Sequence, residues 1–266
     1  MLRWFLIPFI ILLFSGCATH HVSRKGIISR ELPLTLDDLA EIREGEKNYE
    51  KVLWEYHLYE NPKLQKYCNA IAASIAEVST RPHLPYRVVL LDTDEVNIFG
   101  GAGGYVYATR GLFHFVESES ELAGMIAHEI THVANYEYAG LPQFAGVKKV
   151  YGYMLRGSEI AKGNGAGIYG TAANFGLQGI GKAAPVIMHH FSSDQEVLTD
   201  ERAVDSLVKA GYDPQGIYRV IERLARVPMN EVGRFVNLLN THPPFEARRN
   251  VLRDRIRRLD LEKGKL

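Results

Sequence analysis

The chain has 266 residues, of which 46% are hydrophobic and 23% are charged. A chain of this length and composition can bury a sizeable hydrophobic core, which excludes a generally disordered protein. The 31 lysine and arginine residues balance the 31 aspartate and glutamate residues, and no basic stripe interleaved with aromatic residues is present. The composition therefore gives no basis for nucleic-acid binding.

The N-terminal residues differ in composition from the rest of the chain. Arg3 precedes an almost unbroken apolar run, Trp4–Phe14, and small residues follow up to Cys17. A membrane-spanning helix needs about 20 apolar residues, so this shorter run is more typical of a secretory signal peptide. We predict a signal peptide at residues 1–16; a buried helix or an uncleaved anchor is the alternative.

Residues Leu13–Cys17 resemble the lipobox of bacterial lipoproteins, with Phe14 where leucine is usual. By this resemblance Cys17 is lipidated, and it anchors the mature protein to a membrane without spanning it. Ala18 rather than aspartate follows the cysteine, which implies the periplasmic face of the outer membrane. The polar residues 17–35 are expected to form a flexible tether.

The residues after the tether predict two helices and then two strands. Asn61 and Pro62 provide a cap and a first-turn proline for the second helix. A cluster of glycines precedes the second strand, and because it leads into a strand rather than a helix, a phosphate-binding loop is not favoured. In chain order we predict helices at 36–58 and 63–78, a strand at 86–91, a glycine turn at 100–104 and a strand at 105–109.

An HExxH motif at His128–His132 follows on a strongly helical segment, which Ser118 and Glu121 can begin as a capping box. Residues i and i+4 of a helix share one face, so both imidazoles can reach one metal ion. Glu129 projects beside them, where a carboxylate can take a proton from water. The spacing indicates a metal-dependent hydrolase with Glu129 as a catalytic residue.

A zinc site needs a third protein ligand. The next predicted helix carries two Glu-x-x-x-Asp pairs, Glu196 with Asp200 and Glu201 with Asp205, and periodicity alone does not separate them. In either pair the glutamate could bind the metal while the aspartate accepts the ring N–H of a histidine ligand. Glu196 could instead complete a capping box with Ser193, and Asp200 could be a solvated surface charge.

Several further sequence blocks follow one another in a fixed order. They are Asn97–Phe99, Gly103–Tyr107, Thr109–Leu112, the HExxH motif, Ser192–Glu196, Ala210–Pro214, and Thr241–Pro244 with Arg248. Together, over residues 38–255, they resemble the HtpX and CAAX-prenyl-protease family of zinc metallopeptidases, in its soluble periplasmic branch. Ile98 and Thr199 each stand where that family usually has alanine.

The resemblance selects the register with Glu196 and implies one Zn²⁺ ion per chain, bound by His128, His132 and Glu196. It implies that Asp200 is the hydrogen-bond partner of a histidine ligand. It also places His242 near the active site, where the imidazole either stabilises the oxyanion or occupies the fourth zinc position in a resting state.

The resemblance implies an α+β fold, a mostly helical zincin-type metallopeptidase domain at residues 36–260 with a small mixed β-sheet beside the HExxH helix. We expect an endopeptidase that acts on misfolded or unassembled envelope proteins and works with envelope assembly or quality-control partners. A peptide substrate would pair with an exposed strand edge at 105–109. The expected binding residues are Asn97, Tyr105, Val106 and Tyr107.

Two alternatives stay open in the sequence. The glycine-rich residues 157–181 form either a lid over a cleft or a plain connection, and His189 and His190 are assigned to the surface or to that lid. The protein could also be a membrane-tethered chaperone or scaffold with a structural zinc site that His242 closes. Glu129 argues against the scaffold, because a structural site has no use for a general base.

Overall fold

The computed structural model describes residues 33–135, 137–138, 191–228, 230–242 and 245–263. The predicted signal peptide, Cys17, most of the tether, the glycine-rich segment at 157–181, and the pair His189 and His190 lie outside the described residues. Within the described ranges, no helix combines the length and the apolar character that crossing a membrane requires.

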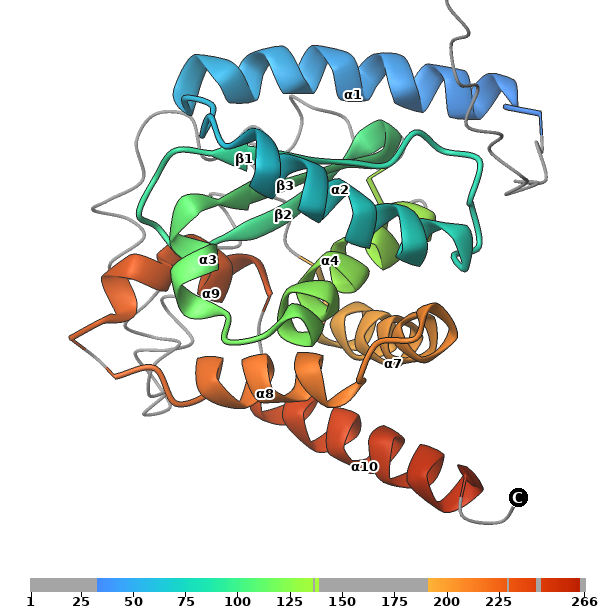
Figure 1. Ribbon diagram of the computed structural model, residues 1–266, viewed down its shortest axis with the longest axis vertical. Helices are drawn as coiled ribbons and strands as arrows, with labels where there is room; N and C mark the ends of the chain where they lie inside the picture. Colours follow the sequence, from blue (N-terminus) through green and yellow to red (C-terminus); the bar gives the residue numbers. More distant parts are fainter. Residues whose placement is uncertain (1–32, 136, 139–190, 229, 243–244, 264–266) are drawn as a thin grey trace, which may run out of the picture.

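The described chain consists of helices around one small mixed sheet, which confirms the predicted α+β class (Figure 1). The N-terminal part contains α1 (Leu36–Glu55), α2 (Pro62–Glu77), β1 (Arg87–Leu91), β2 (Ile98–Gly101), the 3₁₀ helix η1 (Ala102–Gly104), β3 (Tyr105–Thr109), α3 (Arg110–Phe115) and α4 (Glu119–Ala134). The C-terminal part contains α7 (Ser193–Ala210), α8 (Gln215–Leu224), the 3₁₀ helix η3 (Val232–Phe235), α9 (Val236–Thr241) and α10 (Phe245–Lys263).

The sheet contains one strand, β2, that was not predicted, and its last two residues fall in the predicted glycine turn. β2 pairs antiparallel with β3 and includes Gly100 and Gly101. The predicted turn at 100–104 is therefore shorter and begins at Ala102, and it reverses the chain through Gly103 and Gly104, whose φ angles are 72° and 90°. Glycine has no side chain to indicate strand pairing, so only its β3 partners reveal that Gly100 and Gly101 are extended.

β3 is the central strand, parallel to β1 on one side and antiparallel to β2 on the other. The predicted exposed edge at 105–109 is therefore wrong, because both edges of this strand are hydrogen-bonded. α2 covers the outer edge of β1, where Gln65 donates to the Val88 carbonyl (2.6 Å) and Asn69 accepts from the Val88 N–H (2.8 Å). The outer edge of β2, at the other side of the sheet, pairs with no further strand among the described residues.

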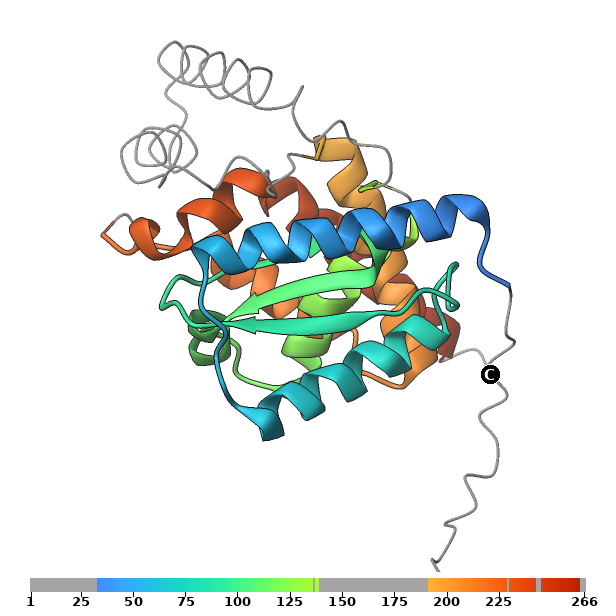
Figure 2. The same ribbon diagram turned by 90° about the horizontal axis from the view of Figure 1, so that it is seen from above.

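The sheet separates α1 from the remaining helices. α1 lies across one face of the sheet (Figure 2). On this face Val52 of α1 packs with Val89 and Leu91 of β1. Val88 and Leu90 face the opposite side and join a larger core with α2, α4, α7 and α8. This alternation follows from the two-residue side-chain period of a strand, and it places α4 between the sheet and the C-terminal helices.

α4 begins at Ser118, whose hydroxyl accepts from the N–H of Glu121 (3.3 Å). The predicted capping box is only half formed, because the Glu121 carboxylate accepts from the N–H of Glu117 (2.8 Å) and pairs with Arg223 of α8. This ion pair joins the start of α4 to α8. The helix is buried along almost its whole length, which holds the face that carries the HExxH motif in a fixed orientation.

Candidate metal centre

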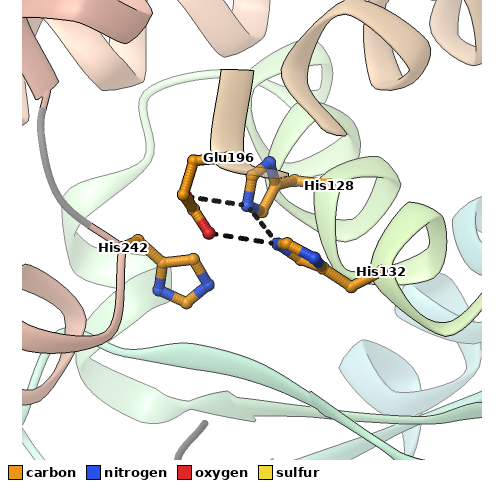
Figure 3. A group of neighbouring side chains, drawn as sticks. All are labelled: His128, His132, Glu196 and His242. Carbon is orange, nitrogen blue, oxygen red and sulfur yellow. Dashed lines mark hydrogen bonds and ion pairs between the residues drawn. The ribbon is translucent and has the colours of Figure 1, made fainter. Parts of the chain in front are cut away.

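Four side chains from three separate parts of the chain converge beside α4 (Figure 3). His128 and His132 project from α4, Glu196 from the first turn of α7, and His242 from the end of α9. All four are buried, and each offers one nitrogen or oxygen atom within 4.8 Å of the others.

The two α4 histidines direct the same ring nitrogen into the cluster. Their Nε2 atoms lie 3.0 Å apart. The Glu196 carboxylate faces both rings, with Oε2 3.5 Å from Nε2 of His128 and Oε1 3.3 Å from Nε2 of His132. Two imidazole nitrogens and one carboxylate therefore face a common point.

A carboxylate lies behind each of these imidazoles. Oδ1 of Asp200 is 2.9 Å from Nδ1 of His128, and Oε2 of Glu137 is 2.6 Å from Nδ1 of His132. An acceptor at Nδ1 fixes the tautomer in which Nε2 carries the lone pair that binds a metal. Asp200 was predicted from the sequence, whereas Glu137 was not, because its only signal was an acidic residue shortly after the HExxH motif.

The cap of α7 explains how Glu196 reaches the cluster. Ser192 is the N-cap and forms a capping box with Gln195, in which Ser192 Oγ accepts from Gln195 N–H (3.3 Å) and Gln195 Oε1 accepts from Ser192 N–H (2.9 Å). The alternative capping box between Ser193 and Glu196 is not formed, because the cap lies one residue earlier in the chain. Because Gln195 makes the capping contact, the Glu196 carboxylate points toward the histidines.

The two possible registers on α7 lie in different environments. Glu196 and Asp200 are fully buried at the cluster. Glu201 and Asp205 instead pair with arginines of α10, Arg258 and Arg255, on the outer side of the helix. The pair selected by the family resemblance is the one that faces the histidines.

Arg248 of α10 connects the carboxylates of this centre. Its Nε and Nη2 atoms donate to the two carboxylate oxygens of Asp200 at 2.7 and 2.9 Å. Its Nη1 atom lies 2.6 Å from Oε2 of Glu196 and donates to the backbone carbonyl of His242 (2.9 Å). One buried guanidinium thus balances two buried carboxylates and holds the backbone at His242.

The local charges shift the pKa values of the cluster. Burial raises the pKa of Glu196, but the charges of Arg248 and His242 and the hydrogen bonds of the α4 histidines outweigh burial and hold it well below its ordinary value. Burial and Arg248 lower the pKa of His128, yet the Asp200 and Glu196 carboxylates prevail and raise it to about 9. The cluster thus attracts positive charge, and a metal ion would compete with a proton for these ligand atoms.

Buried polar atoms of the cluster point to a bound cation. Oε2 of Glu196 is paired with Arg248, but Oε1 of Glu196 and Nε2 of His242 form no hydrogen bond of ordinary geometry within the described part of the chain, and their nearest polar neighbours, Nε2 of His132 and Oε1 of Glu129, lie 3.3 Å away. Buried polar atoms without partners are unfavourable unless something else satisfies them. Imidazole and carboxylate donors in this number suit a divalent transition metal. The residues present therefore fit a metal ion.

Glu129 lies beside the cluster and is fully buried. Its Oε1 atom is 3.3 Å from Nε2 of His242, and its Oε2 atom accepts from the Tyr138 hydroxyl at 3.3 Å. Burial raises the pKa of Glu129, but the charge and hydrogen bonding of His242 outweigh it, so the net pKa is below the ordinary value. The carboxylate is thus ionised and can accept a proton.

The residues expected to bind a substrate occupy several positions. Tyr105 and Tyr107 belong to the core on the α1 side of the sheet, and their rings stack on each other (5.8 Å between centroids). Val106 faces the opposite core. These three are packing residues of a central strand rather than an exposed edge. Asn97 is buried beside the start of β2, and its role in binding stays a prediction.

The chain belongs to peptidase family M48, whose family model matches residues 62–256. This confirms the resemblance to the HtpX-type metallopeptidases. The chain is 29% identical over 206 residues to the β-barrel assembly-enhancing protease of Yersinia pestis, covering 73% of this chain and 39% of that protein. It is 28% identical over 172 residues to the metalloprotease YcaL of Escherichia coli K12, covering 64% of this chain and 61% of the relative.

A third relative is the protease HtpX homolog of Syntrophobacter fumaroxidans, which is 27% identical over 214 residues, covering 67% of this chain and 73% of the relative. The chain spans less than half the length of the β-barrel assembly-enhancing proteases that it matches, 39% in Yersinia pestis and 43% in Escherichia coli K12.

Proposed function

We propose that this protein is a zinc-dependent endopeptidase of the bacterial cell envelope. The observation that carries the proposal is the position of Glu129, a buried ionised carboxylate next to three convergent ligand side chains. A site that only stabilised the fold would need the ligands but no such acceptor, and burying an additional carboxylate there would be unfavourable.

The ligands of a zinc ion, one per chain, would be Nε2 of His128, Nε2 of His132 and the carboxylate of Glu196. Asp200 and Glu137 support this assignment because they hold the opposite nitrogens of both rings. A zinc ion at this position would polarise the scissile carbonyl group and lower the pKa of a water molecule.

Glu129 acts as the general base and then as the general acid. It accepts a proton from the attacking water as the water oxygen bonds to the carbonyl carbon, and it delivers a proton to the amide nitrogen as the C–N bond breaks. His242 stabilises the negative charge on the carbonyl oxygen through Nε2. The 2.7 Å contact between Thr241 Oγ1 and His242 Nδ1, and the bond from Arg248 to the His242 carbonyl, hold this ring in place.

The outer edge of β2 is the place where we propose that an extended substrate binds. The Thr109 N–H donates to the Asn97 carbonyl (3.1 Å), so the alternation of an antiparallel ladder directs the N–H of Gly100 away from β3. A substrate strand added at this edge would bind through backbone hydrogen bonds, which recognise an extended chain rather than a sequence. Such recognition suits unfolded polypeptides.

The proposed substrates are misfolded or unassembled envelope proteins, and the proposed location is the periplasmic face of the outer membrane. The lipobox-like residues up to Cys17 support a lipid anchor. Relatives named β-barrel assembly-enhancing proteases support a link to envelope assembly or quality-control partners.

Replacing Glu129 by glutamine tests the activity. Glu129→Gln should abolish cleavage of casein while the protein still binds approximately one zinc ion per chain, because the variant keeps all ligands. Full activity in this variant would contradict the mechanism. If the wild-type protein does not cleave casein, or if a chelator does not inhibit the cleavage, the result would instead favour the chaperone or scaffold function.

A second pair of variants tests the zinc ligand. Glu196→Ala should lose zinc, and Glu201→Ala, a matched change on the same helix, should keep it because Glu201 pairs with Arg258 on the outer side. Zinc content measured by atomic emission distinguishes them. Zinc loss only in Glu201→Ala would overturn the ligand assignment.

A further inference from the structure

One tyrosine hydroxyl connects the edge of the sheet to the general base. The Tyr138 hydroxyl accepts from the N–H of Gly100 in β2 (3.2 Å) and donates to Oε2 of Glu129 in α4 (3.3 Å). Tyr138 is 8% exposed although it lies beyond the end of α4. The same group thus contacts the strand that we propose to bind substrate and the carboxylate that we propose to activate water.

The Tyr138 hydroxyl lies where an atom of a further strand would lie if the sheet continued beyond β2. The Gly100 N–H points away from β3, so the acceptor for this donor in an extended sheet would be a carbonyl oxygen of the next strand. Among the described residues the Tyr138 hydroxyl fills this place. A substrate that pairs with β2 at Gly100 needs the same N–H for its own carbonyl.

The tyrosine ring also occupies space beside the strand. A Cβ atom at Gly100 would lie 2.7 Å from Cε2 of Tyr138, so the absence of a side chain at residue 100 allows the ring to pack against the backbone. Phe191 and His132 contact the ring edge-on, with centroid distances of 5.5 and 6.3 Å. These contacts keep the ring beside β2 and next to the metal centre.

We propose that Tyr138 competes with the substrate for the Gly100 N–H and must leave this position when a substrate strand pairs with β2. This inference rests on the proposed function, because it concerns the same substrate edge. Displacement would also remove the Tyr138 hydrogen bond from Glu129, so substrate pairing would release the general base. Tyr138 is thus a residue that sets substrate affinity rather than a catalytic residue.

The variant Tyr138→Phe tests the competition, because it removes the hydroxyl and keeps the ring. Without its two hydrogen bonds the ring should be displaced more easily, so KM for casein-derived peptides should fall by about 3–10-fold, the equivalent of one net hydrogen bond. The kcat should stay nearly unchanged, because the ligands and Glu129 are intact. Zinc content and circular dichroism verify that the variant is folded.

Tyr218→Phe is the matched control. The Tyr218 hydroxyl also donates to a carboxylate at 3.3 Å, that of Glu222 on the same helix, α8, outside the metal centre. This variant should keep both the KM and the kcat of the wild type. A KM change of equal size in both variants would overturn the proposal, because it would indicate a general effect of losing a tyrosine hydroxyl.

The remaining outcomes also decide the question. An unchanged or higher KM in Tyr138→Phe would overturn the proposal. A lower kcat at constant KM would do so too, because Tyr138 would then assist Glu129 during the reaction. Titration of the zinc-loaded proteins with fluorescein-labelled casein, followed by anisotropy, separates this inference from the proposed function. If the wild type binds casein without cleaving it, the proposed activity fails, while tighter binding by Tyr138→Phe still supports the competition.

Discussion

The Nδ1 atom of His128 lies 2.9 Å from Oδ1 of Asp200, and both side chains are buried. Asp200 is held in turn by two hydrogen bonds from Arg248. The orientation of the His128 ring is therefore set by a chain of contacts from α10 through α7 to α4. This arrangement makes the metal centre sensitive to residues that do not touch the metal.

Asp200→Asn should weaken zinc binding by about 10–100-fold, because the neutral amide is a weaker acceptor for the His128 ring and removes one of the two anionic partners of Arg248. Competition with a chromogenic chelator measures the affinity. Asp205→Asn is the control on the same helix, since Asp205 pairs with Arg255 of α10 on the outer side of α7. Equal zinc affinities in the two variants would show that the contact between Asp200 and His128 does not contribute to zinc binding.

Glu137→Gln should also weaken zinc binding, by about 10-fold, because Glu137 holds Nδ1 of His132 in the same way. The effect should be smaller than that of Asp200→Asn, since Glu137 is partly exposed and water can replace it. The same chelator competition measures the affinity, with Glu201→Gln as the control. An affinity equal to that of the wild type would contradict the role of Glu137.

His242→Phe should lower kcat by about 10²–10³-fold, the usual effect of removing an oxyanion donor. Zinc content should remain near that of the wild type, because the two α4 histidines and Glu196 still provide three ligands. Peptide hydrolysis and metal analysis on the same preparation measure both quantities. Loss of zinc would instead assign His242 as a metal ligand, and an unchanged kcat would leave it with neither role.

Arg81→Met should destabilise the fold by about 3–5 kcal/mol, because it removes a buried cation from two buried carboxylates. Arg81 pairs with Asp38 and Glu41 of α1 and donates to the Val133 carbonyl at the end of α4 (3.1 Å). Urea unfolding measures the change. Arg110→Met, which removes two surface ion pairs, should leave stability nearly unchanged. Similar losses of stability in both variants would contradict a specific stabilising role for the ion pairs between Arg81 and α1.

Glu95→Gln should stabilise the protein above pH 7 but not at pH 4. Burial raises the pKa of Glu95 to about 7 in the folded protein. The unfolded carboxyl ionises at lower pH, so the wild type should lose stability, on the order of 2 kcal/mol, as pH rises through the interval between the two pKa values. Urea unfolding at both pH values measures this. The control variant Asp94→Asn changes an exposed neighbouring carboxylate, so it should still lose stability as the pH rises.

The α4 half of the metal centre could be predicted from local sequence spacing. His128 and His132 share a helical face because four residues complete about one turn, a local relation that any stable helix enforces. The cap at Ser118 is equally local, although the Glu121 side chain turned to Arg223 instead of closing the box. Glu196 also required the family resemblance, because two registers of α7 have the same spacing.

The remaining features depend on packing between elements that are distant in the chain. Arg248 and His128 are 120 residues apart in the chain, and no periodicity relates such distant positions. β3 contains alternating aromatic residues that resemble an exposed strand, yet it is central because β2, which includes two glycines, pairs with its other edge. The contacts of Glu137 and Tyr138 likewise depend on where α4 ends against the sheet and α7. Local spacing fixes which side chains share a face, whereas packing between distant elements decides what that face meets.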